Sequence, residues 1–146
     1  MKIAYARTPL PKTIFLAGPT PRSSRVDSWR PEALAILESA GFDGTVLVPE
    51  DSDQSWRFSY DDQVEWELQG LHSATVIAFW VPRTMLSEWE PRELKMPALT
   101  TNVEFGLFAS RRNIVLGYPA NAEKMKYLEA IATMYMLLKG TPFIYQ

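Results

Sequence analysis

The sequence predicts an α/β fold, a doubly wound sheet of about five mostly parallel strands with helices on both faces. Short apolar runs, which are typical of buried strands, alternate along the chain with segments of helical periodicity. The run at 75–81 is almost wholly apolar, as expected of a central strand that is covered on both faces. The 146 residues have the length of one domain, 1–146, which can bury a sizeable core.

Two strands and two helices are expected in the first half of the chain. Apolar runs at 13–17 and 45–48 stop at Gly-Pro and Pro, which cannot continue a sheet ladder. Between them lies a predicted helix with Pro31 in its first turn, capped by Asp27 or Ser28 and ended by a glycine. A second helix is expected at about 61–71.

The spacing of apolar residues predicts which faces of these two helices are buried. The residues expected to face the core are Leu34, Ile36, Leu37, Val64, Leu68 and Leu71. Beside the apolar stripe of the second helix runs a neighbouring stripe of Gln63, Glu67 and Gly70.

The second half of the chain begins, after the central strand, with a long proline-bearing loop at 82–100. A loop of this length in a compact domain is more often a lid or a binding loop than a mere connection. The further elements expected are a helix to about Arg111, a strand at 114–118, a helix at 122–139 and a short strand at 142–146.

Charge and composition exclude several classes of protein. The net charge is −2 and the Lys and Arg residues are scattered, so no nucleic acid polymer is expected as a partner. The chain has no cysteine, and its one histidine, His72, has no evident partner, so no metal or other cofactor is expected. No apolar run is long enough to span a membrane, which favours a cytoplasmic protein without a membrane partner.

The heptapeptide at 100–106 carries the most informative carboxylate. Glu104 is expected in the first turn of a helix, where the partial positive charge of the N-terminus favours an ionised acid. A fixed, ionised carboxylate suits the nucleophile of a covalent glycosyl-transfer enzyme. Thr101 and Glu104 also fit a capping box, in which the glutamate only satisfies a backbone amide.

The predicted sheet topology favours the functional interpretation. Ligands of doubly wound sheets bind beyond the carboxyl ends of the strands, where 18–20, 49–50, 80–82 and the start of the Glu104 helix would meet. Retaining cleavage of an N-glycosidic bond needs a carboxylate at the anomeric carbon and a proton donor for the leaving base. Glu104 can be the first group. Glu67 is the best candidate for orienting or protonating the base, although it equally fits a plain surface carboxylate.

Aromatic and polar residues near this edge are weaker candidates. Flat rings suit a nucleobase, but at these spacings they more often belong to the core; the rings concerned are Trp29, Phe58, Trp66 and Trp80. The segment 18–24 lacks the glycine pattern of a phosphate-binding loop. Its Arg22, Ser23 and Ser24 could nevertheless hold a ribose hydroxyl or a phosphate.

Several short motifs occur in a characteristic order between Ile14 and Tyr118. They are Phe15-Leu16-Ala17-Gly18-Pro19, Ser28-Trp29-Arg30, Val48-Pro49-Glu50, Gln63-Val64-Glu65-Trp66-Glu67, the apolar 74–80 strand and Val103-Glu104-Phe105-Gly106. This set resembles the nucleoside 2-deoxyribosyltransferase-like family, in its bacterial and phage branch with Trp-Arg and Gln-x-x-Trp-Glu motifs.

The resemblance implies a flavodoxin-like fold and a homodimer or higher homo-oligomer whose neighbouring chain completes each site. It implies double displacement on a small-molecule nucleoside or nucleotide, with Glu104 as the nucleophile and Glu67 at the base. The residues expected to bind substrate are Gly18, Pro19, Arg22, Ser23, Trp29, Gln63, Trp66 and Asn102.

The chain departs from the family's pattern at three positions. Phe15 stands where a tyrosine positions the nucleophile, Ala98 where a second base-contacting acid is expected, and Thr75 where an aspartate is usual. The predicted function is cleavage of the N-glycosidic bond of nucleosides or their 5′-monophosphates through a glycosyl-Glu104 intermediate, with transfer to a base or water. The alternatives are a non-catalytic nucleotide-binding module and an interaction protein that uses the loop around Trp89.

Overall fold

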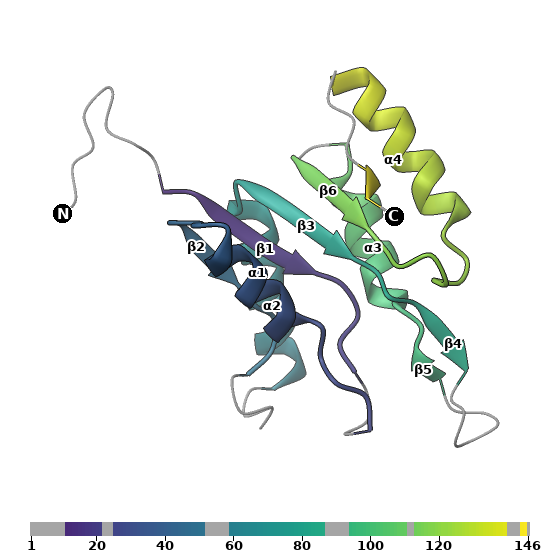
Figure 1. The fold of residues 1–146 in the computed structure, drawn as a ribbon, viewed down its shortest axis with the longest axis horizontal. Coiled ribbons are helices and arrows are strands. Elements are labelled where there is room, and N and C mark those ends of the chain that lie inside the picture. Colours follow the sequence, from purple (N-terminus) through teal and green to yellow (C-terminus); the bar gives the residue numbers. More distant parts are fainter. Residues whose placement is uncertain are drawn as a thin grey trace.

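The computed structural model of the protein describes residues 11–21, 25–51, 59–86, 94–110, 113–139 and 144–145. Within them a parallel sheet has the order β2-β1-β3-β6-β7 (Figure 1). Its strands are β1 (Thr13–Ala17), β2 (Thr45–Leu47), β3 (Val76–Trp80), β6 (Ile114–Gly117) and the two-residue β7 (Ile144–Tyr145). This order confirms the predicted flavodoxin-like fold, in which the chain moves from β1 to one side and then to the other.

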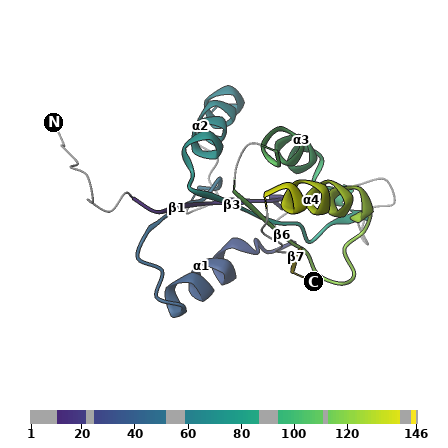
Figure 2. The same cartoon turned by 90° about the horizontal axis from the view of Figure 1, so that it is seen from above.

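Helices cover both faces of the sheet. They are α1 (Arg30–Ser39), α2 (Tyr60–Ser73), α3 (Leu99–Phe108) and α4 (Lys126–Lys139). Figure 2 shows α1 alone on one face and α2, α3 and α4 on the other. The main core lies beneath the three helices, where the rings of Phe79 on β3 and Phe105 on α3 make a T-shaped contact with 5.0 Å between centroids.

The predicted core face of α1 is wrong in part. Ile36 is 60% exposed and Leu34 is also exposed, whereas Leu37 is half-buried. Leu34 and Ile36 are two positions apart and therefore cannot face the same side of a helix. The inward side instead follows the buried Arg30, with Ala33 and Leu37 at helical spacing from it.

The rotation of α2 also differs from the prediction. Leu71 is buried as expected, but Leu68 is exposed, and the stripe of Gln63, Glu67 and Gly70 turns inward. A Cβ atom on Gly70 would lie 2.7 Å from Cε2 of Phe15, so only glycine allows this close approach of α2 to β1. The close packing brings the polar stripe above the sheet edge.

The segment predicted as a loop at 82–100 contains regular structure. β4 (Thr84–Leu86) pairs antiparallel with β5 (Leu94–Met96), while Trp89 lies outside the described residues. The helix then begins earlier than predicted, because Ala98 takes a left-handed conformation (φ 56°) that ends the loop and serves as its N-cap. It ends at Phe108, short of the predicted Arg111.

No helix in the described ranges combines the length and the apolar content that crossing a membrane requires.

Candidate active site

A cavity of about 480 Å³ opens beyond the carboxyl end of β1, where the strand order reverses. It is lined by residues 17–21 after β1, by one side of α2 and by residues 97–101 at the start of α3. Arg30 and Pro49 complete the lining from two further segments. Three of the four predicted segments therefore meet here, whereas 80–82 does not line the cavity.

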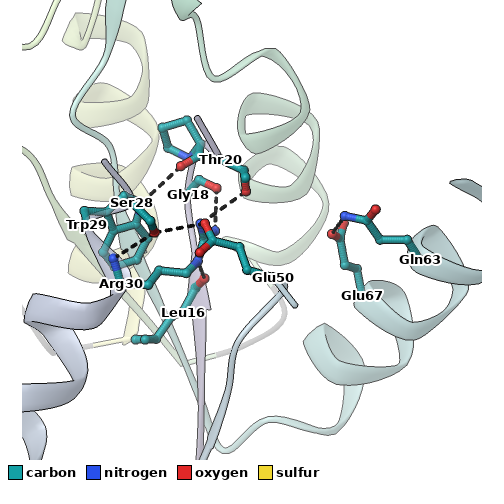
Figure 3. A network of polar contacts seen from close by, with 10 residues as sticks. Leu16, Gly18, Thr20, Ser28, Trp29, Arg30, Glu50, Gln63 and Glu67 are labelled. Carbon is teal, nitrogen blue, oxygen red and sulfur yellow. Dashed lines mark hydrogen bonds and ion pairs between the residues drawn. The ribbon is translucent and has the colours of Figure 1, made fainter. Parts of the chain in front are cut away.

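Two carboxyl groups enter this cavity from different helices. Glu67 comes from the inward stripe of α2 and Glu104 comes from α3. The side-chain amide of Gln63, one turn before Glu67, donates a 2.8 Å hydrogen bond to Glu67 Oε1 and so orients that carboxyl (Figure 3). The sequence prediction that Glu67 and Gln63 lie on a shared stripe facing a polar site agrees with this arrangement.

The environment of Glu104 differs from the one predicted. Because α3 begins at Leu99, Glu104 lies in its second turn, and Thr101 cannot be the helix cap. Both the capping-box interpretation and the argument from the helix N-terminus are therefore wrong. Burial, followed by the negative charge of Glu67, raises the pKa of Glu104 to about 7, and the positive charge of Arg30 opposes this rise.

The pKa of Glu67 is also raised above its ordinary value. Burial raises the pKa of Glu67, while the hydrogen bond from Gln63 and the charge of Arg30 act against that effect. Perturbed carboxyls facing one cleft are typical of sites that move protons.

A buried ion pair lies beside the cavity (Figure 3). Arg30 is 1% exposed and its Nη1 donates to Oε1 of Glu50, which follows β2. The hydroxyl of Ser28 donates a 3.0 Å bond to the same oxygen. Burial lowers the pKa of Arg30, and the charge of Glu50 opposes this effect. Glu50 therefore neutralises most of the positive charge of Arg30.

Gly18 is held tightly where the cavity meets the end of β3. A Cβ atom at this position would lie 2.1 Å from the carbonyl oxygen of Trp80 and 2.9 Å from Cζ2 of Trp29. The backbone after β1 therefore follows its path only because residue 18 has no side chain.

The predicted substrate-binding residues divide into three groups. Gly18, Pro19 and Gln63 line the cavity together with the two glutamates. Arg22 and Ser23 lie outside the described residues.

Trp29, Trp66 and Asn102 form the third group, which is absent from the lining of the cavity. Trp29 donates its indole N–H to the carbonyl of Pro19 at 3.1 Å. Trp66 packs on Phe15, with 6.1 Å between ring centroids, and lines a neighbouring hollow of about 640 Å³. Asn102 accepts a hydrogen bond from Arg83.

Two of the three departures from the family's pattern line the cavity. Phe15 and Ala98 both border it, where they present a ring without a hydroxyl and a methyl group. Thr75 instead lies just before β3, at the amino end of the strand, where its hydroxyl accepts a 3.1 Å bond from the amide of Thr13.

Sequence reasoning missed several residues of the site. Tyr60 and the buried Thr101 also line the cavity. Arg30 and Glu50 belong to short motifs, but their spacing along the chain does not indicate that they pair, because Glu50 follows β2 whereas Arg30 begins α1.

The fold and the cavity define a doubly wound α/β protein with two carboxyl groups at the switch point of its sheet. The chain belongs to the nucleoside 2-deoxyribosyltransferase-like family, whose model matches residues 11–121. A comparison with curated proteins finds no match. Within the described part of the chain, no group of three His, Cys, Asp or Glu side chains could hold a metal ion.

Proposed function

We propose that the protein cleaves the N-glycosidic bond of nucleosides, deoxynucleosides or their 5′-monophosphates and transfers the sugar to a base or to water. The observation that carries the proposal is the meeting of Glu104 and Glu67 in one cavity at the switch point of the sheet. Family membership supports the class of chemistry, because the family is described as nucleoside 2-deoxyribosyltransferase-like.

In the first displacement, a carboxylate oxygen of Glu104 forms a bond to the anomeric carbon while the carbon–nitrogen bond breaks. The electron pair of that bond stays on the base, whose nitrogen takes up a proton. In the second displacement, a nitrogen of an acceptor base or a water oxygen attacks the same carbon, loses a proton and releases the Glu104 carboxylate. Two displacements give overall retention.

The pKa of Glu104 supports a role for Glu67 in proton transfer. With a pKa of about 7, Glu104 holds a proton in many molecules near neutral pH, and attack requires that this proton leaves. The departing base needs one proton at the same stage. A carboxyl on the same cavity, oriented by Gln63, is suited to deliver it.

The charge of the cavity lining bears on the 5′ group of the substrate. Among the lining residues that the structure describes, Arg30 is the one cation, and each of its three side-chain nitrogens already donates to the protein. A 5′-phosphate would therefore depend on Arg22, Ser23 and Ser24, which the sequence places directly after this wall of the cavity.

The proposed function is tested by incubating the purified protein with a panel of nucleosides and 5′-monophosphates, with and without an acceptor base. Free base is expected in the chromatogram, and a new nucleoside would distinguish transfer from hydrolysis. Tight binding of a panel member without any product, across a panel that includes modified bases, would contradict catalysis. It would favour the nucleotide-binding module.

Replacing Glu67 by Gln is expected to lower kcat by about 10²- to 10⁴-fold, since a proton donor is lost. The acid limb of the pH–rate profile should move to lower pH, because the charge that helps to raise the pKa of Glu104 is gone. The control is Glu65→Gln, an exposed neighbour that likewise accepts a side-chain hydrogen bond from a glutamine one turn away. An unchanged rate and base preference in Glu67→Gln would contradict the assignment.

We also propose a homodimer or higher homo-oligomer in which a second copy covers α3. Leu99, Val103 and Leu107 recur every fourth residue on this helix and are 48–63% exposed. Leu99 lines the cavity as well, so the apolar stripe runs to the edge of the site. Apolar stripes of this kind on a helix are usually covered.

Val103→Glu is expected to lower the mass in solution, because a charge would be buried between copies. Tyr127→Glu, at an exposed apolar residue of α4, is the control and should leave the mass unchanged. Light scattering after gel filtration measures both. A monomeric wild-type protein would contradict the proposed oligomer but would leave the proposed glycosidic cleavage unaffected.

A further inference from the structure

Arg30 is the largest fully buried side chain among the described residues, and it borders the cavity. A buried cation is costly unless it is paired and hydrogen-bonded. Glu50 supplies the counter-charge, and the Glu50 side chain is itself only 8% exposed. The pair could therefore serve solely to fix α1 against the sheet, or it could serve the cavity as well.

The other hydrogen bonds of Arg30 favour the second reading. Its Nε donates to the carbonyl of Leu16 at 3.2 Å, its Nη2 to the carbonyl of Gly18 at 2.8 Å and its Nη1 to the hydroxyl of Thr20 at 3.2 Å. These acceptors are alternate residues of one stretch of chain. A single planar guanidinium thus fixes the backbone that lines the cavity directly after β1.

The neighbouring residue acts on the same stretch. Trp29 holds the carbonyl of Pro19, between two of the acceptors of Arg30, and its ring lies 4.7 Å from the Arg30 guanidinium carbon. The start of α1 therefore bonds four of the five residues from Leu16 to Thr20. This is more than is needed to fix a helix that is otherwise largely exposed.

We propose that Arg30, held by Glu50, is a positioning residue that holds residues 16–20 and thereby fixes the cavity wall after β1, against which the substrate binds beside Glu104. The proposal rests on the proposed function, since it assigns this wall to the same site. The charge of Arg30 also acts across the cavity, because it lowers the pKa of both Glu67 and Glu104 against the effect of burial.

Backbone order parameters of Gly18 and Thr20, from NMR relaxation of their amides, test the positioning without any substrate. In Arg30→Lys the point-like ammonium cannot reach all the acceptors, so these order parameters are expected to fall from about 0.85, the value of rigid backbone, to below about 0.6. The control is Arg83→Lys. Arg83 is also buried and donates to the carbonyl of Lys124, but it does not line the cavity, and its replacement should leave the order parameters of Gly18 and Thr20 unchanged.

Kinetics add a readout that a purely structural role would not change. Arg30→Lys keeps the charge and is expected to raise KM at least about tenfold while the acid limb of the pH–rate profile stays in place. In Arg30→Met paired with Glu50→Leu, which avoids an unpaired buried carboxylate, the acid limb should move to higher pH. The cation that lowers the pKa of Glu104 is then absent.

The outcomes separate this proposal from the proposed function. Wild-type order parameters at Gly18 and Thr20 in Arg30→Lys would overturn it, whatever the protein catalyses. If the Arg30 variants do not fold, Thr20→Val removes one of the bonds alone and should lower the order parameter of Gly18; no change there would equally overturn it. A wild-type protein without turnover would refute the proposed function, while the order parameters would still decide the role of Arg30.

Discussion

Glu104→Gln is expected to lose at least about 10⁴-fold in kcat and yet to be more stable than the wild type at pH 8. The loss of activity follows from the proposed nucleophile, because an amide oxygen does not form the glycosyl intermediate. Mass spectrometry of acid-quenched reactions should find the sugar on the peptide containing Glu104 in the wild type and not in the variant. An active Glu104→Gln enzyme would contradict the mechanism.

The gain in stability follows from the raised pKa of Glu104. The pKa of Glu104 rises from the ordinary glutamate value of 4.5 to about 7 in the folded protein, which therefore binds this proton more tightly than the unfolded chain does. Wild-type stability is therefore lost as the pH rises through this window, by at most about 3 kcal/mol, and partial exposure makes the loss smaller. Glutamine does not ionise, so thermal unfolding should separate the two proteins at pH 8 and bring them together near pH 4.

The same pKa predicts the pH dependence of catalysis. The nucleophile must be ionised, so kcat/KM should fall as the pH drops below about 7.

A Glu104→Gln protein that is less stable than the wild type at pH 8 would contradict the burial of an ionisable group at this position.

Gly18→Ala is expected to destabilise the protein by about 3 kcal/mol or more and to remove activity. The added methyl group would lie 2.1 Å from the carbonyl oxygen of Trp80, which ends the central strand β3 and pairs in register with Gly117. That backbone cannot retreat, so the wall after β1 must move away from the cavity. Urea unfolding measures the loss of stability.

Gly106→Ala is the matched control for this substitution. A Cβ atom on Gly106, in the last turn of α3, would meet no atom within 4 Å. Alanine also favours the helix over glycine, so a gain of about 0.5–1 kcal/mol is expected. Equal stability of Gly18→Ala and the wild type would show that the cavity wall is not packed against β3 as the structure describes.

The fold could be predicted from the sequence because it rests on local patterns. Apolar runs and helical spacing indicate the strands and helices, and the switch-point rule brings the start of the Glu104 helix to the carboxyl edge of the sheet. Glu67 is predicted instead from its stripe beside Gln63 and from the family resemblance. The start of α3 was not predictable in this way. It depends on the left-handed conformation of Ala98, a residue type that seldom adopts it.

Contacts between distant segments account for the other differences. Arg30 and Glu50 are twenty residues apart and meet only because β1 and β2 are neighbours in the sheet. The exposure of Leu68 likewise follows from the contact of Gly70 with Phe15, which turns α2 about its axis. Neither contact has a signature in the spacing of residues along the chain.

The separation of the two carboxyls is consequently controlled by a residue that has no functional group. Gly70 sets how near the backbone of α2 comes to β1, and Glu67 is carried on the same helix one turn earlier. In glycoside cleavage, the gap between acid and nucleophile decides whether a water molecule fits between them. Under the proposed mechanism, ångström-scale changes in packing at the back of a helix would therefore decide between retention through Glu104 and inversion by a water molecule, without the substitution of any reacting group.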